Sequence, residues 1–68
     1  MRGRQMLRQW TLLKHLQAGA WLSIRALTIG LPPDLACHPR TVRRDIDLLS
    51  LIFPIGEESG KYTMRGKL

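Results

Sequence analysis

The sequence predicts one small domain that is mainly α-helical and ends in a β-hairpin. Two observations predict this fold class. Apolar residues recur every three or four positions in two long segments, and this period gives way to alternation after Phe53. At 68 residues, with 44% hydrophobic composition, the chain fits a single domain over residues 1–68 with a thin core. A chain of this size buries only about 60% of the surface that its unfolded form exposes.

The first helix is predicted over residues 4–18, ending before Gly19. Its apolar stripe comprises Met6, Leu7, Trp10, Leu12, Leu13 and Leu16. The opposite side carries Arg8, Gln9, Lys14 and Gln17. Because Trp10 falls within the stripe, we expect it in the core rather than on the surface as a stacking platform for bases.

A second, short helix is predicted over residues 23–30, with Ser23 as its N-cap. Ala20–Leu22 before it is a candidate for a minimal strand, and Trp21 is expected in the core. Ile24, Leu27 and Ile29 are expected to face inward. The run Gly30-Leu31-Pro32-Pro33-Asp34 breaks regular structure. The chain either leaves the helix there or resumes as a turn through Asp34–Ala36.

The third helix is predicted over residues 39–51, because Pro39 suits a first helical position, where its missing N–H costs nothing. Val42, Ile46 and Leu49 form a buried stripe at i, i+4 and i+7, with Leu48 and Ile52 beside it. The remaining surface carries Arg40, Arg43, Arg44 and Asp47.

A β-hairpin is predicted over residues 53–65, with Ser59-Gly60 as its tight turn. Ile55 lies on its first strand, and Tyr62 and Met64 alternate on its second. Three helices followed by a hairpin are the order of a three-helix winged helix-turn-helix. That fold suits duplex DNA, because a helix fits the major groove and a second helix braces it.

The charge favours a polyanionic partner. Eleven Lys and Arg against five Asp and Glu give a net charge of +6, which attracts nucleic acid first and anionic membrane second. No apolar run approaches the roughly 20 residues that span a bilayer. A single cysteine, Cys37, forms no internal disulfide and predicts a cytoplasmic, nucleoid-associated protein. Neither a metal site, a cofactor site nor a catalytic constellation is predicted, so we expect no enzyme.

One run is more specific. His38-Pro39-Arg40-Thr41-Val42-Arg43-Arg44-Asp45-Ile46-Asp47-Leu48-Leu49 resembles the recognition helix of DeoR-type and WYL-domain bacterial transcriptional regulators, which carry R-T-[VI]-x-R-D-[IL]-x-x-L. Phe53-Pro54-Ile55, Tyr62 and the segment 12–19 also resemble that family, so the likeness covers about residues 5–65. Residues 30–34 look like an insertion relative to it.

The resemblance implies sequence-specific double-stranded DNA binding by a transcriptional regulator or its DNA-binding domain. Arg40 and Thr41 would meet phosphates or base edges, and Arg43 and Arg44 would bind guanine in bidentate fashion. The other expected DNA contacts are His38, Asp47, Lys61, Arg65 and Arg4. Structural support of the recognition helix is assigned to Pro39, Val42, Asp45, Ile46 and Leu49. We expect Asp45 to fix a neighbouring arginine, and Asp47 to be a groove-edge acceptor or merely solvent-facing.

The family also implies a homodimer, or an additional C-terminal sensing and oligomerising region in a longer protein. Two other functions remain open on the residues alone. One is a winged helix that serves as a protein–protein interaction module, and the other is a cationic RNA-binding protein.

Overall fold

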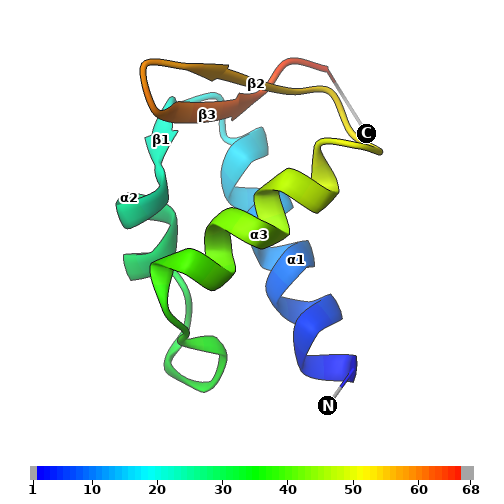
Figure 1. Cartoon of the computed structure of the whole chain (residues 1–68), viewed down its shortest axis with the longest axis vertical. Helices are drawn as coiled ribbons and strands as arrows, with labels where there is room; N and C mark the ends of the chain where they lie inside the picture. The colour runs from blue at the N-terminus through cyan, green and yellow to red at the C-terminus, as the bar shows by residue number, and fades with distance from the viewer. Residues whose placement is uncertain (1, 67–68) are drawn as a thin grey trace.

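The computed structural model describes residues 2–66 and is mainly helical with a small antiparallel sheet (Figure 1). The elements run in the order α1 (Arg2–Gln17), β1 (Leu22–Ser23), α2 (Ile24–Ile29), the 3-10 turn η1 (Pro33–Leu35), α3 (Pro39–Leu49), β2 (Ile55–Glu58) and β3 (Lys61–Met64). Strand β3 lies between β1 and β2, pairing Tyr62 with Leu22 and Met64 with Ile55. The predicted fold class is confirmed, and the minimal strand before α2 joins the hairpin as a third strand.

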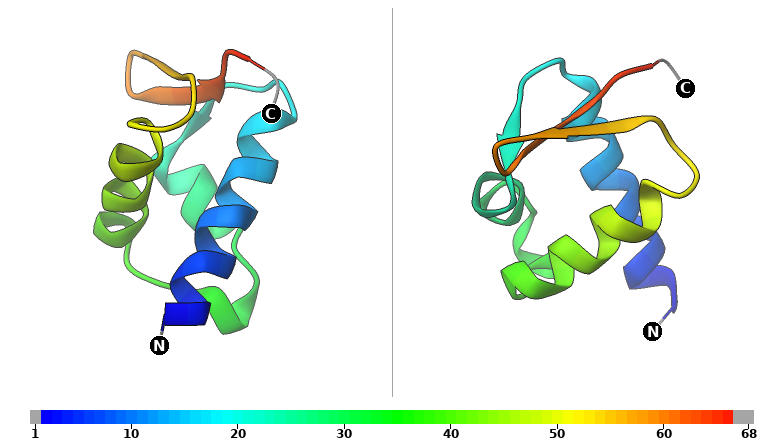
Figure 2. Two further views of the ribbon diagram at one scale, coloured as in Figure 1. Left: turned by 90° about the vertical axis from the view of Figure 1, so that its right-hand side faces the viewer. Right: turned by 45° about the horizontal axis from the view of Figure 1, so that its top comes forward.

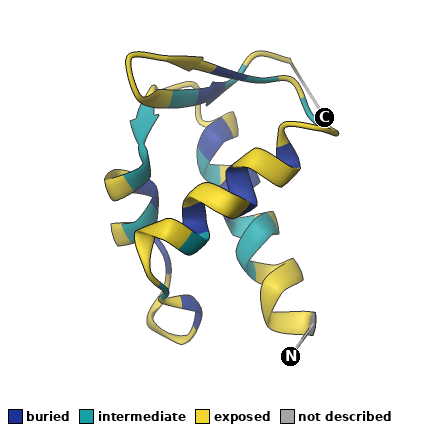
Figure 3. Ribbon diagram, viewed as in Figure 1, coloured by how far each residue is buried: buried dark blue, intermediate teal, exposed yellow. Residues whose placement is uncertain are grey.

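The core lies where the three helices meet beneath the sheet (Figure 3). Its buried side chains are Leu12, Leu13, Leu16, Leu27, Leu31, Val42, Ile46 and Leu49. Half-buried side chains from the sheet, among them Leu22, Ile55, Tyr62 and Met64, close it from above. The sheet sits across one end of the helices, as the left view of Figure 2 shows.

Local chemistry explains where the elements begin and end. Gly19 has a φ of 91°, a left-handed conformation that favours glycine and ends α1 as predicted. The Ser23 hydroxyl accepts a hydrogen bond from the Ala26 N–H at 3.0 Å, so Ser23 is the predicted N-cap of α2. The chain then resumes as η1, with Leu35 buried.

Several apolar residues that the periodicity placed inward are exposed. Trp10 is 52% exposed and Met6 is 70% exposed, although both fall within the apolar stripe of α1. Trp21 also remains 39% exposed. The expectation that both tryptophans lie in the core is therefore wrong.

The remaining differences between the predicted and the observed structure lie at the ends of α2 and α3. Ile29, the last residue of α2, is 72% exposed. Helix α3 ends at Leu49, earlier than the predicted residue 51, and Ile52 lies in the following turn, 76% exposed. Phe53 packs against the core there instead, with its N–H bonded to the Leu49 carbonyl at 2.8 Å. Leu48 is also exposed.

Within the described part of the chain, no helix is long and apolar enough to cross a membrane.

Candidate nucleic-acid interface

Helix α3 carries most of the predicted contacts, and its start is set by two residues. Pro39 is the first helical residue, as predicted, and His38 before it is the N-cap. The His38 side chain accepts at Nδ1 a hydrogen bond from the Arg40 N–H, at 3.0 Å. His38 is thus exposed and engaged through one ring nitrogen in capping the helix, a structural role beside the predicted contact to DNA.

One side of α3 is anchored in the protein. Val42, Asp45, Ile46 and Leu49 are all buried, with exposures of 5% or less. These positions, together with Pro39 at the N-terminus, are the predicted structural support of the helix. The opposite side of α3 is therefore presented in a fixed orientation.

The presented side carries the predicted arginines. At about 100° per residue, Arg40, Arg44 and Asp47 follow one stripe opposite the buried face, and Arg43 lies one position toward the sheet. All four side chains are exposed, whereas Thr41 is half-buried. Among residues 3–66, none of the three arginines forms an ion pair. Their charge is thus available to a partner.

The N-terminal half of α3 is unusually cationic for a helix start. Helices favour acidic residues in their first turn, because the macrodipole makes that end positive. Helix α3 has no acidic residue there, and Arg40 sits within that turn. The helix end and the arginines therefore add to one positive field, which suits an anion such as phosphate.

Asp45 has the structural role that the sequence predicts, but with a different partner. It accepts hydrogen bonds from Arg8 of α1, through Nε to one carboxylate oxygen and through Nη2 to the other at 3.2 Å. Gln9 donates a further bond at 3.2 Å. The hydrogen bond that Arg8 donates to Asp45 raises the pKa of Arg8, which remains cationic. Arg8 and Gln9, expected on the outer side of α1, thus face α3.

The hairpin formed by β2 and β3, the candidate wing, presents a mixture of charges. Lys61 is exposed. Arg65 contacts Glu58 at 3.3 Å, and its guanidinium carbon lies 5.6 Å from the centre of a Trp21 ring. Glu57 accepts a hydrogen bond from the Gly60 N–H at 2.8 Å. The sequence reasoning overlooked these two carboxylates, although Glu57-Glu58 directly precedes the predicted turn.

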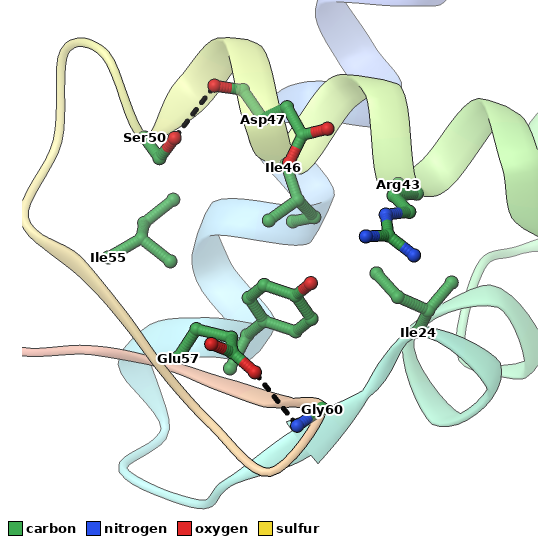
Figure 4. Close-up of a pocket in the computed structure, with 9 residues that line it drawn as sticks. Ile24, Arg43, Ile46, Asp47, Ser50, Ile55, Glu57 and Gly60 are labelled. Carbon is green, nitrogen blue, oxygen red and sulfur yellow. Dashed lines mark hydrogen bonds between the residues drawn. The ribbon is translucent and has the colours of Figure 1, made fainter.

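A cleft of about 450 Å³ separates α3 from the wing (Figure 4). Arg43 and Asp47 of α3 and its C-cap Ser50 line one side, and Glu57 and Tyr62 face them from the sheet. Two carboxylates beside one arginine make this cleft a poor site for a free anion. Within residues 3–66, no three His, Cys, Asp or Glu side chains are grouped as metal ligands would be.

The predicted contacts do not all lie together. Arg40, Arg43 and Arg44 form one cluster on α3, and Arg43 faces the wing across the cleft. Arg4 is exposed in the first part of α1, at the end of the molecule away from the sheet (Figure 1). Arg4 therefore lies at the opposite end of the molecule from the wing residues Lys61 and Arg65.

Comparison of the chain with protein-family models, with curated proteins and with solved structures gives no match.

Proposed function

We propose that the chain binds double-stranded DNA through α3, as a transcriptional regulator or the DNA-binding domain of one. The observation that carries the proposal is the cluster of Arg40, Arg43 and Arg44. These side chains are exposed and unpaired within residues 3–66, on a helix whose other side is anchored by four buried residues. An exposed cationic helix of fixed orientation is what entry into the major groove requires.

The positions of the arginines suggest a division of labour. Arg40 and Arg44 lie one turn apart on the most exposed stripe, where guanidinium groups can meet the O6 and N7 atoms of guanine. Arg43 lies beside that stripe, toward the wing, and its charge adds to the same cationic face of α3. The positive helix start supplements both contacts.

The acidic side chains determine which end of α3 lies closest to the DNA. Asp47 lies one turn beyond Arg43, and Glu57 and Glu58 lie on the wing. These carboxylates repel phosphate, so the duplex is expected to approach the N-terminal half of α3 most closely. The proposed function is that of DeoR-type and WYL-domain regulators, which the run 40–49 resembles, and it implies a cytoplasmic, nucleoid-associated protein.

A fluorescence-anisotropy titration with short duplexes drawn from a random pool tests the proposal. Replacing Arg43 and Arg44 together by alanine should lower affinity by about 10- to 100-fold and reduce the slope of log K against log salt. The matched control is Lys14→Glu on α1, which changes the net charge by the same two units. Equal losses in the two variants would overturn the assignment of α3.

Competition by structured RNA distinguishes the cationic RNA-binding alternative. Preferential release of the duplex by RNA would overturn DNA as the partner. A duplex that binds with no dependence on salt would contradict a mechanism based on phosphate contacts.

A further inference from the structure

An apolar groove runs along the side of the molecule where α1 meets the end of α3. Its volume is about 480 Å³. Four exposed side chains form its rim, Met6, Leu7 and Trp10 from α1 and Ile52 from the turn after α3. The core residues Leu13 and Leu49 and the half-buried Phe53 form its floor. We call these residues the α1/α3 groove.

The groove exposes much apolar surface for so small a chain. Its rim side chains are 52–76% exposed, which for side chains of about 150–250 Å² amounts to roughly 500 Å². Leu48 and Leu51, near Ile52 in the chain, are a further 44% and 81% exposed. These two residues do not line the groove. The rim side chains alone, counted for two copies, give about 1,000 Å² in total, the lower limit for a specific interface. Apolar patches of this size on soluble proteins mark contact surfaces.

The groove has little polar lining, so it suits an apolar partner surface rather than a charged one. Gln9 is the one polar residue lining the groove within the described part of the chain, and its amide is already bonded to Asp45. The neighbouring Arg8 is neutralised by the same carboxylate. A second α1/α3 groove could therefore be buried against the first without stranding a charge.

The shape favours self-association about a two-fold axis. Met6, Trp10 and Leu13 follow each other at i, i+4 and i+7, a seam that an antiparallel copy of α1 can match. The same patch offers both a protruding ring, Trp10, and a hollow beside Leu49 and Phe53. A two-fold contact needs such a self-complementary patch, because each copy presents the same residues.

We infer that the α1/α3 groove is the surface through which two copies of this chain associate. The groove reaches the C-terminal end of α3, whereas the arginines lie in its N-terminal half. Two copies joined there would present two arginine clusters related by a two-fold axis, which matches the two half-sites that a dimer reads. This last point rests on the proposed function, but the apolar groove itself does not.

Sedimentation velocity of the chain without DNA, at increasing concentration up to about 1 mM, tests the inference. We expect a monomer–dimer equilibrium that Leu7→Glu shifts to monomer. Ile29→Glu is the matched control, because Ile29 is 72% exposed on α2, outside the groove, and receives the same charge. Circular dichroism checks that each variant is folded. If Leu7→Glu is unfolded, Trp10→Ala replaces it as the groove variant.

Salt separates this association from DNA binding. The exposed Arg4 and Lys14 on α1 repel their counterparts in a second copy, so added salt should strengthen the dimer while it weakens the complex with DNA. A chain that stays monomeric throughout would overturn the pairing, whatever its DNA affinity. A dimer that Leu7→Glu and Ile29→Glu affect equally would overturn the assignment to the groove.

Discussion

Arg8 of α1 is paired with Asp45 of α3, a carboxylate that is only 1% exposed. Asp45 directly follows Arg43 and Arg44 in the sequence, yet its partner comes from another helix, 37 residues away. The pair therefore fixes the orientation of α3 on α1, and with it the direction in which Arg40 and Arg44 point.

Arg8→Ala should be strongly destabilising. It leaves a buried carboxylate with Gln9 as its remaining side-chain donor, a loss of about 3–5 kcal/mol. A domain of this length is stable by only about 3–10 kcal/mol in total. Urea unfolding followed by circular dichroism measures the loss. Arg4→Ala, at an exposed position on the same helix, is the control and should change stability by less than about 0.5 kcal/mol.

The double variant Arg8→Met with Asp45→Leu should recover most of that stability, because replacing both partners by apolar residues removes the uncompensated charge. If the double variant is as unstable as the sum of the two single ones, the pair does not act as a unit.

The sequence predicts the fold well because its signals are local. The Ser23 cap, Pro39 at the start of α3 and the Ser59-Gly60 turn each depend on neighbouring residues, and all three are present in the structure. The buried stripe of Val42, Ile46 and Leu49 follows from helical periodicity alone.

The remaining errors concern which face meets another element. Periodicity marks Trp10 as part of an apolar stripe, but cannot show that its neighbours Leu49 and Phe53 leave it 52% exposed. It likewise assigns Arg8 to a polar face, although Asp45 draws it inward. An acidic residue within an arginine-rich helix was the available signal that such a distant partner exists.

The turn at Ser59-Gly60 gives a prediction on backbone strain. Ser59 has a φ of 52° and Gly60 a φ of 78°, both left-handed, as a type I′ hairpin requires. Gly60→Ala should therefore cost about 1 kcal/mol, and Ser59→Asn should stabilise by a few tenths. Gly3→Ala is the control, because Gly3 lies in α1 with nothing near an added Cβ, and it should be neutral or stabilising. Thermal unfolding of the three variants ranks them, and equal effects of the two alanines would rule out strain at the turn.

Gly56 on β2 makes room for Arg65. A Cβ at this position would lie 2.0 Å from the Arg65 Nε. Gly56→Ala should displace that flexible side chain from Trp21, at a cost of about 0.5–1 kcal/mol, the range expected for an exposed cation–π contact. A change in Trp21 fluorescence reports the displacement. It is measured in a Trp10→Phe variant, so that the signal comes from Trp21 alone. In an Arg65→Ala background the same substitution should cost nothing, and an undiminished cost there would show that Arg65 is not what Gly56 accommodates.

The acidic wing gives the last prediction. Glu58 is 66% exposed and pairs with Arg65, so the pair contributes little to stability. Glu58→Gln removes a charge that repels phosphate and releases Arg65 to meet the DNA backbone. Affinity for duplex DNA should therefore rise about three- to tenfold at low salt, with a gain that shrinks as salt is added. Gln17→Lys on α1 raises the net charge by the same one unit, and it should have a smaller effect. If both variants gain equally in anisotropy titrations, the wing lies away from the DNA and net charge alone accounts for the gain.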